Sequence, residues 1–279
     1  MMQHQTEPLA LQAEALCRRA EGQRIGFVPT MGYLHSGHTS LMEIARKHCD
    51  WLVVSIFVNP LQFGPNEDLD RYPRDPLGDA AKCERVGVDM LFSPEAMYPP
   101  AHSTTVAVSG LTAGFCGASR PNFFGGITTV VSRLFGLVQP TVAVFGEKDF
   151  QQLAVIRRMV RDLAMPIEII GGPLIRDDDG LAMSSRNRYL SPAQRQRALS
   201  LNQALRAMQA ALSSHGPGIP AAELLKTGRK VLNFDEFDYL NIVDPDTLEQ
   251  MPLIDRPARA LLGGDIGATR LIDNMALVP

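Results

Sequence analysis

Two histidines three residues apart, His35 and His38, are the side chains of this chain best placed to do chemistry. They end the segment Pro29–His38, which follows the apolar run Arg24–Val28 and precedes an expected helix, Thr39–Lys47. The free N–H groups and the dipole of a helix N-terminus attract anions. Two imidazoles at such a terminus suit a triphosphate whose α-phosphorus is attacked, because they can stabilise the charge that develops on oxygen.

The same two histidines would also fit a metal site or a structural role in the first turn of a helix. A metal site needs about three protein ligands, and no further His or Cys lies within a few residues of this pair. We therefore favour contact with phosphate over binding of a metal.

The segments that must position these histidines alternate between strand-like and helix-like patterns up to about Leu174. Near-continuous apolar strands are typical of a sheet covered on both faces, and their alternation with helices predicts a doubly wound parallel sheet. The expected strands are Ile25–Pro29, Leu52–Val58, Met90–Ser93, Val106–Val108, Val142–Phe145 and Ile167–Leu174, and the expected helices are Thr39–Lys47, Leu77–Val86, Ile127–Val138 and Phe150–Leu163.

Three polar loops follow expected strands, at Pro29–His38, Asn59–Phe63 and Gly146–Asp149. In a sheet of this class, ligands bind beyond the carboxyl ends of the strands, near a switch in strand order. The three loops are therefore expected to converge on one ligand-binding edge.

The pattern changes after about Leu174. A charged loop leads to Met183–Arg188, a long helix runs from Ser191 to about Leu212, and Ser213–Gly218 is rich in Gly, Ser and Pro. We expect a Rossmann-like domain over residues 1–174 and a smaller C-terminal α+β lid domain over residues 175–279. Strands of the smaller domain are expected at Phe237–Val243, Arg259–Gly263 and Thr269–Ile272.

The composition of the 279 residues is that of a soluble globular protein, with 45% hydrophobic and 20% charged residues. A net charge of −3 argues against a general nucleic-acid binder. No apolar run approaches the length of a membrane span, and the N-terminus lacks the layout of a signal peptide. The four cysteines are scattered without a CxxC pair, which indicates reduced thiols and a cytoplasmic location.

Five blocks of this sequence together resemble the pantothenate synthetase (pantoate–β-alanine ligase) family. They occur in the family's order, extend over nearly the whole chain, and are Pro29–His38, Ser55–Phe63, Phe145–Leu153, Met183–Asn187 and Arg270–Asn274. The resemblance implies ATP-dependent condensation of pantoate with β-alanine through a pantoyl-adenylate, with release of AMP and diphosphate. It also implies Mg²⁺ and a homodimer, for which Ser103–Val108 is a candidate interface strand.

The nucleotide site follows from the positions of these blocks together with the resemblance. Lys148 follows a strand at the active edge, so phosphate contact is favoured over a solvated charge; Asp149 can cap the next helix, bind the ribose or metal, or do both. An interdomain loop can close over the β- and γ-phosphates. The residues expected to bind ATP are Met31, Gly32, Tyr33, Leu34, His35, Ser36, Gly37, His38, Gly146, Glu147, Lys148, Asp149, Ile175, Met183, Ser184, Ser185 and Arg186.

The resemblance assigns catalytic roles within this set. His38 would be a proton donor that His35 supports, and the remaining catalytic residues would be Lys148, Ser184, Ser185 and Arg186. No residue stands out as a covalent nucleophile.

The acid substrate is expected to contact two glutamines. The amides of Gln62 and Gln152 can donate and accept hydrogen bonds, which suits a substrate with a carboxylate and hydroxyls. Either one alone would be interpreted as a surface glutamine, but together they match the family's pantoate-binding pair. Asn59 and Tyr72 are expected in the same pocket. Asp79 resembles the family's magnesium-associated acid, and a solvated helix carboxylate fits it equally well.

The sequence departs from the family pattern at three positions: Phe123 stands where His is common, Gly125 where a polar residue is, and Gly78 where a second acid is often found. Two other functions stay open. One is a nucleotidylyltransferase that stops at a nucleotidyl product of another small substrate, and the other is a non-catalytic ATP-binding relative.

Overall fold

The computed structural model describes residues 1–65 and 67–279. In this described part, the main sheet has six parallel strands in the order β1-β4-β3-β2-β5-β6. Strand order reverses between β2 and β5, and the carboxyl ends of these two strands are where a doubly wound sheet binds its ligand. The strands are β1 (Gln3–Gln5), β2 (Ile25–Thr30), β3 (Trp51–Ile56), β4 (Met90–Phe92), β5 (Val142–Gly146) and β6 (Glu168–Gly172).

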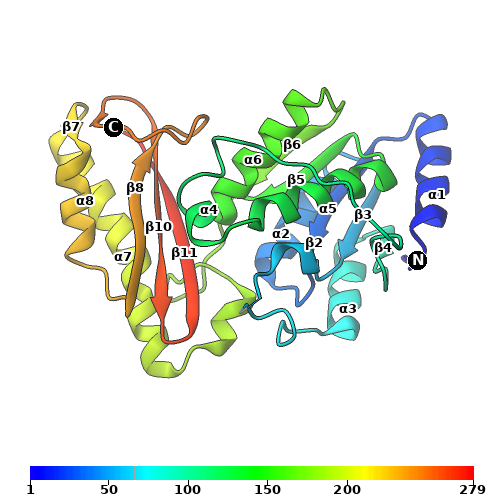
Figure 1. The fold of residues 1–279 in the computed structure, drawn as a ribbon, viewed down its shortest axis with the longest axis horizontal. Coiled ribbons are helices and arrows are strands. Elements are labelled where there is room, and N and C mark those ends of the chain that lie inside the picture. The colour runs from blue at the N-terminus through cyan, green and yellow to red at the C-terminus, as the bar shows by residue number, and fades with distance from the viewer. Residues whose placement is uncertain (66) are drawn as a thin grey trace.

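Helices cover both faces of this sheet, as Figure 1 shows. On β2, Phe27 packs among residues of α1, α5 and α6, whereas its neighbour Val28 packs among residues of α2 and α3. Successive residues of a strand face opposite sides, so a run in which every residue is apolar is buried on both. The helices are α1 (Pro8–Ala20), α2 (Ser36–Arg46), α3 (Pro76–Val86), α4 (Cys116–Ser119), α5 (Phe123–Val138) and α6 (Phe150–Asp162), with short 3₁₀ turns η1 (Pro60–Gln62) and η2 (Glu147–Asp149).

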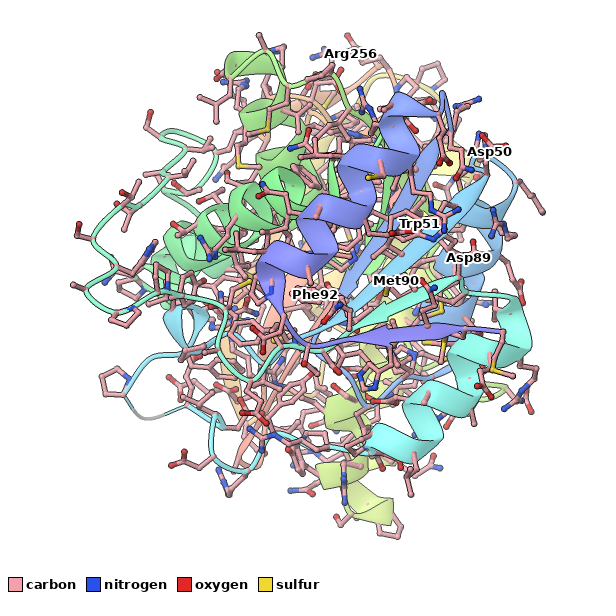
Figure 2. The ribbon with its side chains drawn as sticks, turned by 90° about the vertical axis from the view of Figure 1, so that its right-hand side faces the viewer. Asp50, Trp51, Asp89, Met90, Phe92 and Arg256 are labelled. Atoms are coloured by element: carbon pink, nitrogen blue, oxygen red, sulfur yellow. The ribbon has the colours of Figure 1, made fainter. Side chains whose placement is uncertain are left out.

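The N-terminal strand and helix close one edge of the sheet. Figure 2 views this edge, with α1 crossing the sheet near Trp51, Met90 and Phe92, three residues of the same buried cluster. The guanidinium of Arg18 on α1 lies 5.5 Å from the centre of the Trp51 ring. The sequence pattern did not predict β1 or α1, because β1 has only three residues, all polar, and only Leu11 and Ala15 of α1 are buried.

The C-terminal part builds a second, antiparallel sheet with its own core (Figure 1). Its order is β11-β10-β8, and α7 and α8 pack against it. The bounds are η3 (Ser185–Tyr189), α7 (Pro192–His215), β7 (Ile219–Pro220), α8 (Ala221–Arg229), β8 (Glu236–Val243), β9 (Leu253–Ile254), β10 (Ala258–Ile266) and β11 (Thr269–Leu277). The expected α/β class with a smaller α+β part is confirmed. None of the described helices has both the length and the apolar character needed to cross a membrane.

One expected strand, Val106–Val108, is wrong, and with it the strand proposed for an interface at Ser103–Val108. The chain there is not part of a sheet. Its backbone bonds instead to side chains of α5: the Val106 N–H donates to Thr129 Oγ1, and the Val106 carbonyl accepts from Thr128 Oγ1. Hydroxyls from a neighbouring helix therefore replace the partner strand that an alternating apolar pattern suggests.

Candidate active site

The turn between β2 and α2 is held from behind by a buried carboxylate. Asp79, 1% exposed on α3, accepts hydrogen bonds from the backbone N–H groups of Tyr33 at 2.8 Å and Leu34 at 2.7 Å. Gly32 in the same turn has φ +88°, and a Cβ there would lie 2.9 Å from Ile56 and 3.1 Å from Asp79. Glycine at 32 and an acid at 79 together fix the direction in which α2 begins.

The two histidines cap α2 reciprocally. His35 is the N-cap residue: its Nδ1 accepts from the Gly37 N–H at 3.2 Å, and the Nδ1 of His38 accepts from the His35 N–H at 3.2 Å. The ring centres lie 4.1 Å apart. Because both Nδ1 atoms accept, a neutral ring carries its proton on Nε2. The rings thus retain two Nε2–H donors for a ligand.

Both histidines are neutral in the free protein at physiological pH. Burial, reinforced by the charge of Lys148, lowers the pKa of His35 from 6.5 to about 4. Burial, followed by the neighbouring His35 and Lys148, lowers the pKa of His38 from 6.5 to about 3. The rings are therefore hydrogen-bond donors toward an anion rather than permanent charges. An imidazolium donor, as the resemblance suggested for His38, would require the negative charge of a bound ligand.

The loop after β3 presents one glutamine to the cavity and uses an asparagine to hold it. Asn59, 1% exposed, donates from Nδ2 to Gln62 Oε1 and to the Gly126 carbonyl, both at 3.1 Å, and accepts at Oδ1 from Tyr98 and Leu61. Gln62 Nε2 donates only to the thioether of Met31, at 3.0 Å, among described residues. A thioether is a weak acceptor, so the Gln62 amide remains available to a ligand while Asn59 orients it.

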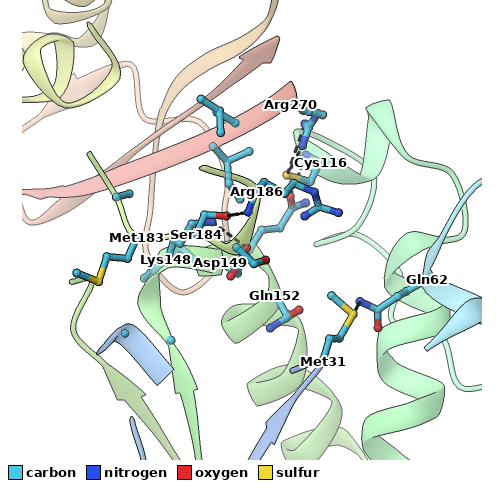
Figure 3. A pocket seen from close by; sticks show the side chains of 18 of the residues that line it. Met31, Gln62, Cys116, Lys148, Asp149, Gln152, Met183, Ser184, Arg186 and Arg270 are labelled. Atoms are coloured by element: carbon cyan, nitrogen blue, oxygen red, sulfur yellow. Dashed lines mark hydrogen bonds and ion pairs between the residues drawn. The ribbon is translucent and has the colours of Figure 1, made fainter. Parts of the chain in front are cut away.

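Of two consecutive glutamines on α6, only the second faces the cavity freely. Gln151 is 6% exposed and takes three backbone partners, the Cys116 N–H and the carbonyls of Leu111 and Gly114. Gln152 makes no side-chain hydrogen bond to any described residue, and it points toward the same space as Gln62 (Figure 3). The structure thus brings Gln62 and Gln152 together.

The turn between β5 and α6 carries Lys148 and Asp149 into the cavity. Lys148 Nζ lies 3.7 Å from Asp149 Oδ1. Asp149 is the N-cap residue of α6 but makes no capping bond with its side chain, so the carboxylate stays available. Glu147, expected to bind ATP, does not line the cavity; its carboxylate pairs instead with Arg259 at 3.0 Å.

The 175–189 segment is anchored by the C-terminal sheet. Arg176 makes a bidentate pair with the buried Asp273, at 2.7 and 2.9 Å. Ser184 Oγ accepts from the Arg186 N–H at the start of η3, and Ser185 Oγ lies 3.2 Å from the hydroxyl of Tyr72. Ser185 is therefore linked to the loop that follows Gln62, and Tyr72 makes this link rather than standing free for a substrate.

Two arginines of the cavity wall pair with adjacent acids that sequence reasoning did not single out. Arg186 donates from Nε and Nη2 to Asp68, at 3.2 and 3.0 Å. Arg120 donates from Nε and Nη2 to Glu67, at 2.6 and 2.5 Å, and its guanidinium carbon lies 3.5 Å from the centre of the Phe123 ring. Phe123, which stands where the family commonly has His, thus stacks on the guanidinium of Arg120.

These elements enclose a cavity of about 700 Å³, within the range of small-molecule sites. Figure 3 shows Met31, Gln62 and Gln152 at one end and Lys148, Ser184 and Arg186 at the other. The predicted residues that line it are Met31, His35, Gly37, His38, Asn59, Gln62, Tyr72, Gly146, Lys148, Asp149, Gln152, Ile175, Met183, Ser184, Ser185 and Arg186. Tyr33 and Ser36 line a smaller adjoining hollow of about 390 Å³, and Gly32, Leu34 and Glu147 line neither.

The expectation of a metal at Asp79 does not fit this geometry. Both of its oxygens accept backbone N–H groups, and the residue is 1% exposed behind the turn. At Gly78, a Cβ would lie 2.0 Å from the carboxylate of Asp75, which leaves no room for a second acid. The placement of Asp79 argues for support of the turn and against metal binding.

Sequence reasoning also missed the functional contribution of Asp273 and Asn274. Asn274 donates from Nδ2 to the carbonyls of Glu147 and Lys148, at 2.9 and 2.8 Å. The available signal was their place in the block Arg270–Asn274, which belonged to the resemblance without a role. For Glu67 and Asp68 the sequence offered only two acids in a polar loop.

Comparisons with known proteins agree with this geometry. A model of the family described as pantoate-beta-alanine ligase matches residues 3–276. A pantothenate synthetase of Desulfatibacillum aliphaticivorans is 51% identical over 278 residues, covering 98% of this chain and 99% of the relative. One from Thermus thermophilus is 53% identical over 263 residues, covering 91% of this chain and 94% of the relative.

Solved structures extend the likeness to three dimensions. A crystal structure of pantothenate synthetase from Thermus thermophilus superposes with a TM-score of 0.93 at 48% identity, and each chain is covered completely. The pantoate-beta-alanine ligase of Francisella tularensis, solved with beta-gamma ATP and beta-alanine, has a TM-score of 0.79 at 31% identity, covering 99% of this chain and 97% of that one. This chain therefore belongs to the pantoate–β-alanine ligase family.

Proposed function

We propose that the protein condenses pantoate with β-alanine in two ATP-dependent steps. In the first, a carboxylate oxygen of pantoate attacks the α-phosphorus of ATP, forming pantoyl-adenylate and releasing diphosphate. In the second, the amine of β-alanine attacks the acyl carbon, loses a proton, and displaces AMP to leave the amide bond of pantothenate. The observation that carries this proposal is one cavity lined by the amides of Gln62 and Gln152 at one end and by the histidine-capped terminus of α2 and Lys148 at the other. The relative from Francisella tularensis, whose complex contains an ATP analogue and beta-alanine, supports it.

The phosphate end would stabilise the charge that develops as diphosphate departs. The Nε2–H groups of His35 and His38 donate to phosphate oxygens, as do Lys148 and the hydroxyls of Ser184 and Ser185. Arg186 contributes its charge from the interdomain segment, and Ile175 lies beside the nucleotide base. A neutral His38 can still donate a hydrogen bond, and a phosphate held against its ring would raise its pKa toward proton transfer.

The acid end would orient pantoate for attack. Gln62 and Gln152 offer amides to its carboxylate and hydroxyls, while Asn59 and Tyr72 act behind them by holding Gln62 and Ser185. Holding two reactants in line contributes several kcal/mol to the lowering of the barrier, about 7–11 in the best cases. The first step therefore needs no covalent nucleophile from the protein.

Magnesium fits the carboxylate of Asp149. Mg²⁺ is usually bound by one or two carboxylates together with substrate phosphates, and Asp149 presents an uncapped carboxylate at the phosphate end of the cavity. The ion would neutralise part of the charge on the phosphates. Asp79, already occupied by the turn, is not part of this proposal.

The proposal includes the wider organisation expected from the family. Residues 175–279 would act as a lid over residues 1–174, so that an adenylate formed in the cavity is shielded from water. We further propose that the protein is a homodimer located in the cytoplasm.

The decisive experiment mixes the purified protein with ATP, Mg²⁺, pantoate and β-alanine and measures AMP and diphosphate. Equal amounts of AMP and diphosphate that depend on both pantoate and β-alanine are expected. Diphosphate without AMP would instead indicate a nucleotidylyltransferase. ATP binding with no turnover would indicate a non-catalytic relative. The family match and the two glutamines that line the cavity favour the ligase over both.

A further inference from the structure

Glu67 and Asp68 stand next to each other in the chain but hold arginines that serve opposite ends of the cavity. Glu67 pairs with Arg120, which also donates a hydrogen bond to the backbone carbonyl of Gln62. Asp68 pairs with Arg186. All four charged side chains line the cavity and are partly buried. Two acids joined by a single peptide bond therefore contact the arginines of the two ends of the cavity, Glu67 at the acid end and Asp68 at the phosphate end.

On the acid side, Arg120 alone connects the Glu67 carboxylate to the backbone of Gln62. Arg120 Nη2 donates to the carbonyl of Gln62 at 3.1 Å, in addition to its two bonds with Glu67. The Phe123 ring covers the guanidinium plane. Arg120 is thereby fixed on three sides, and it fixes the end of η1 from which the Gln62 amide faces the cavity.

On the phosphate side, the pairing leaves half of the guanidinium free. Asp68 occupies the edge formed by Nε and Nη2. Arginine has five N–H donors in a rigid fork, and Nη1 of Arg186 donates to no described residue. The edge formed by Nη1 and Nη2 therefore retains donors that can bind a phosphate while Asp68 holds the other edge.

We propose that Glu67 and Asp68 are positioning residues for the two ends of the reaction, Glu67 for pantoate through Arg120 and Asp68 for ATP through Arg186. This inference rests on the proposed function of the cavity. Asp68 pre-orients the guanidinium, so that less conformational entropy is lost when the triphosphate binds. Glu67 does the same for the segment that presents Gln62.

The proposal predicts that the two neighbouring variants weaken different substrates. Glu67→Gln should raise KM for pantoate about tenfold while KM for ATP stays within about twofold, a tenfold change being about 1.4 kcal/mol. Asp68→Asn should raise KM for ATP about tenfold while KM for pantoate stays within about twofold. Asp70→Asn, which alters an exposed acid of the same loop, is the matched control and should change neither. Asp68→Glu keeps the charge and should recover part of the affinity for ATP.

A double-mutant cycle tests whether Asp68 acts through Arg186. Asp68→Asn combined with Arg186→Lys should cost less than the sum of the two single changes, because both disturb one contact. Thermal midpoints of all variants separate this from loss of folding.

Three results would overturn the inference: additive effects, equal rises in both KM values for each acid, or no rise for either. The proposed function fails separately, if the wild-type protein itself releases no AMP from pantoate and β-alanine.

Discussion

The side-chain nitrogen of Asn274 lies 2.8 Å from the backbone carbonyl oxygen of Lys148, so the C-terminal sheet directly fixes a residue of the phosphate end. The same nitrogen also donates to the carbonyl of Glu147, and Arg259 Nε donates to Asn274 Oδ1 at 2.8 Å. Asn274 is 3% exposed. The side-chain amide of Asn274 thus forms a buried hydrogen-bonded link between β11 and the turn after β5.

Removal of the Asn274 side chain should lower both the stability of the protein and its affinity for ATP. Asn274→Ala removes this partner from the carbonyls of Glu147 and Lys148 and from the Nε–H of Arg259, and an unsatisfied buried group costs about 1–3 kcal/mol. We expect a lower thermal midpoint and a KM for ATP raised at least severalfold, measured by calorimetry and AMP release. Asn241→Ala on β8, where the side chain makes no hydrogen bond to described residues, is the control. A stable Asn274→Ala protein with normal KM for ATP would contradict the role.

Substitutions of His38 can distinguish the role of its Nδ1, which caps α2, from the role of its Nε2–H as a donor. His38→Asn places an oxygen near the position of Nδ1, so the bond to the His35 N–H can survive while the Nε2–H donor is lost. Loss of one preorganised donor to a developing oxyanion typically costs about 100- to 1,000-fold in kcat, and we expect a fall of that size with an unchanged circular dichroism spectrum. His38→Gln, which places an amide N–H near the position of Nε2, should retain more activity than His38→Asn. The reverse order would show that the cap, and not the donor, is what His38 provides.

Acid should destabilise the protein through the same histidines. Their pKa values in the native state, about 4 and about 3, lie below the unfolded value of 6.5. As pH falls below 6.5, the unfolded chain binds protons that the native chain does not, so the free energy of unfolding decreases. This loss continues until pH reaches the native pKa values.

Urea unfolding between pH 7 and pH 5 measures this effect. Relative to the wild type, His38→Asn should lose less stability over this interval, by on the order of 1 kcal/mol. Equal losses in the two proteins would mean that His38 has an ordinary pKa in the folded state.

Two glycine substitutions separate backbone strain from crowding. Gly22 has φ +79° with nothing near its Cβ direction, so Gly22→Ala should cost about 1 kcal/mol from conformation alone. Gly32→Ala adds contacts with Ile56 and Asp79, and it should cost more and also raise KM for ATP. Chemical denaturation and kinetics of the two variants provide the comparison. Equal destabilisation by the two substitutions would show that contacts with Ile56 and Asp79 add nothing to the cost at Gly32.

The sequence predicted most of the main sheet because its central strands are apolar at every position. β2, β3 and β5 were expected within two residues of their observed ends, and the loops that follow them were expected to converge. Both properties follow from burial on two faces and from parallel topology. β1 escaped detection because it has only three residues, all of them polar.

Most residues that the sequence pointed to line the cavity, whereas contacts between two side chains could not be predicted. Gln152 and Gln151 are equivalent in the sequence, and only the fold turns Gln151 toward Cys116 and Gln152 toward the cavity. Likewise, the pairing of Asp68 with Arg186 joins residues 118 positions apart. The buried state of Asp79 depends on the Gly32 turn, which no local pattern of α3 reveals.

The alternation of β11 has a consequence for where the chain can change in length. Asp273 and Asn274 are consecutive, yet Asp273 anchors the 175–189 segment through Arg176 and Asn274 anchors the turn at Lys148. Their register is set against β10 by a hairpin at Gly267 and Ala268. One residue inserted or deleted there would exchange the two faces of the strand and release both loops at once. Ser213–Gly218 takes part in neither contact, so we expect a change in its length to leave both anchors in place.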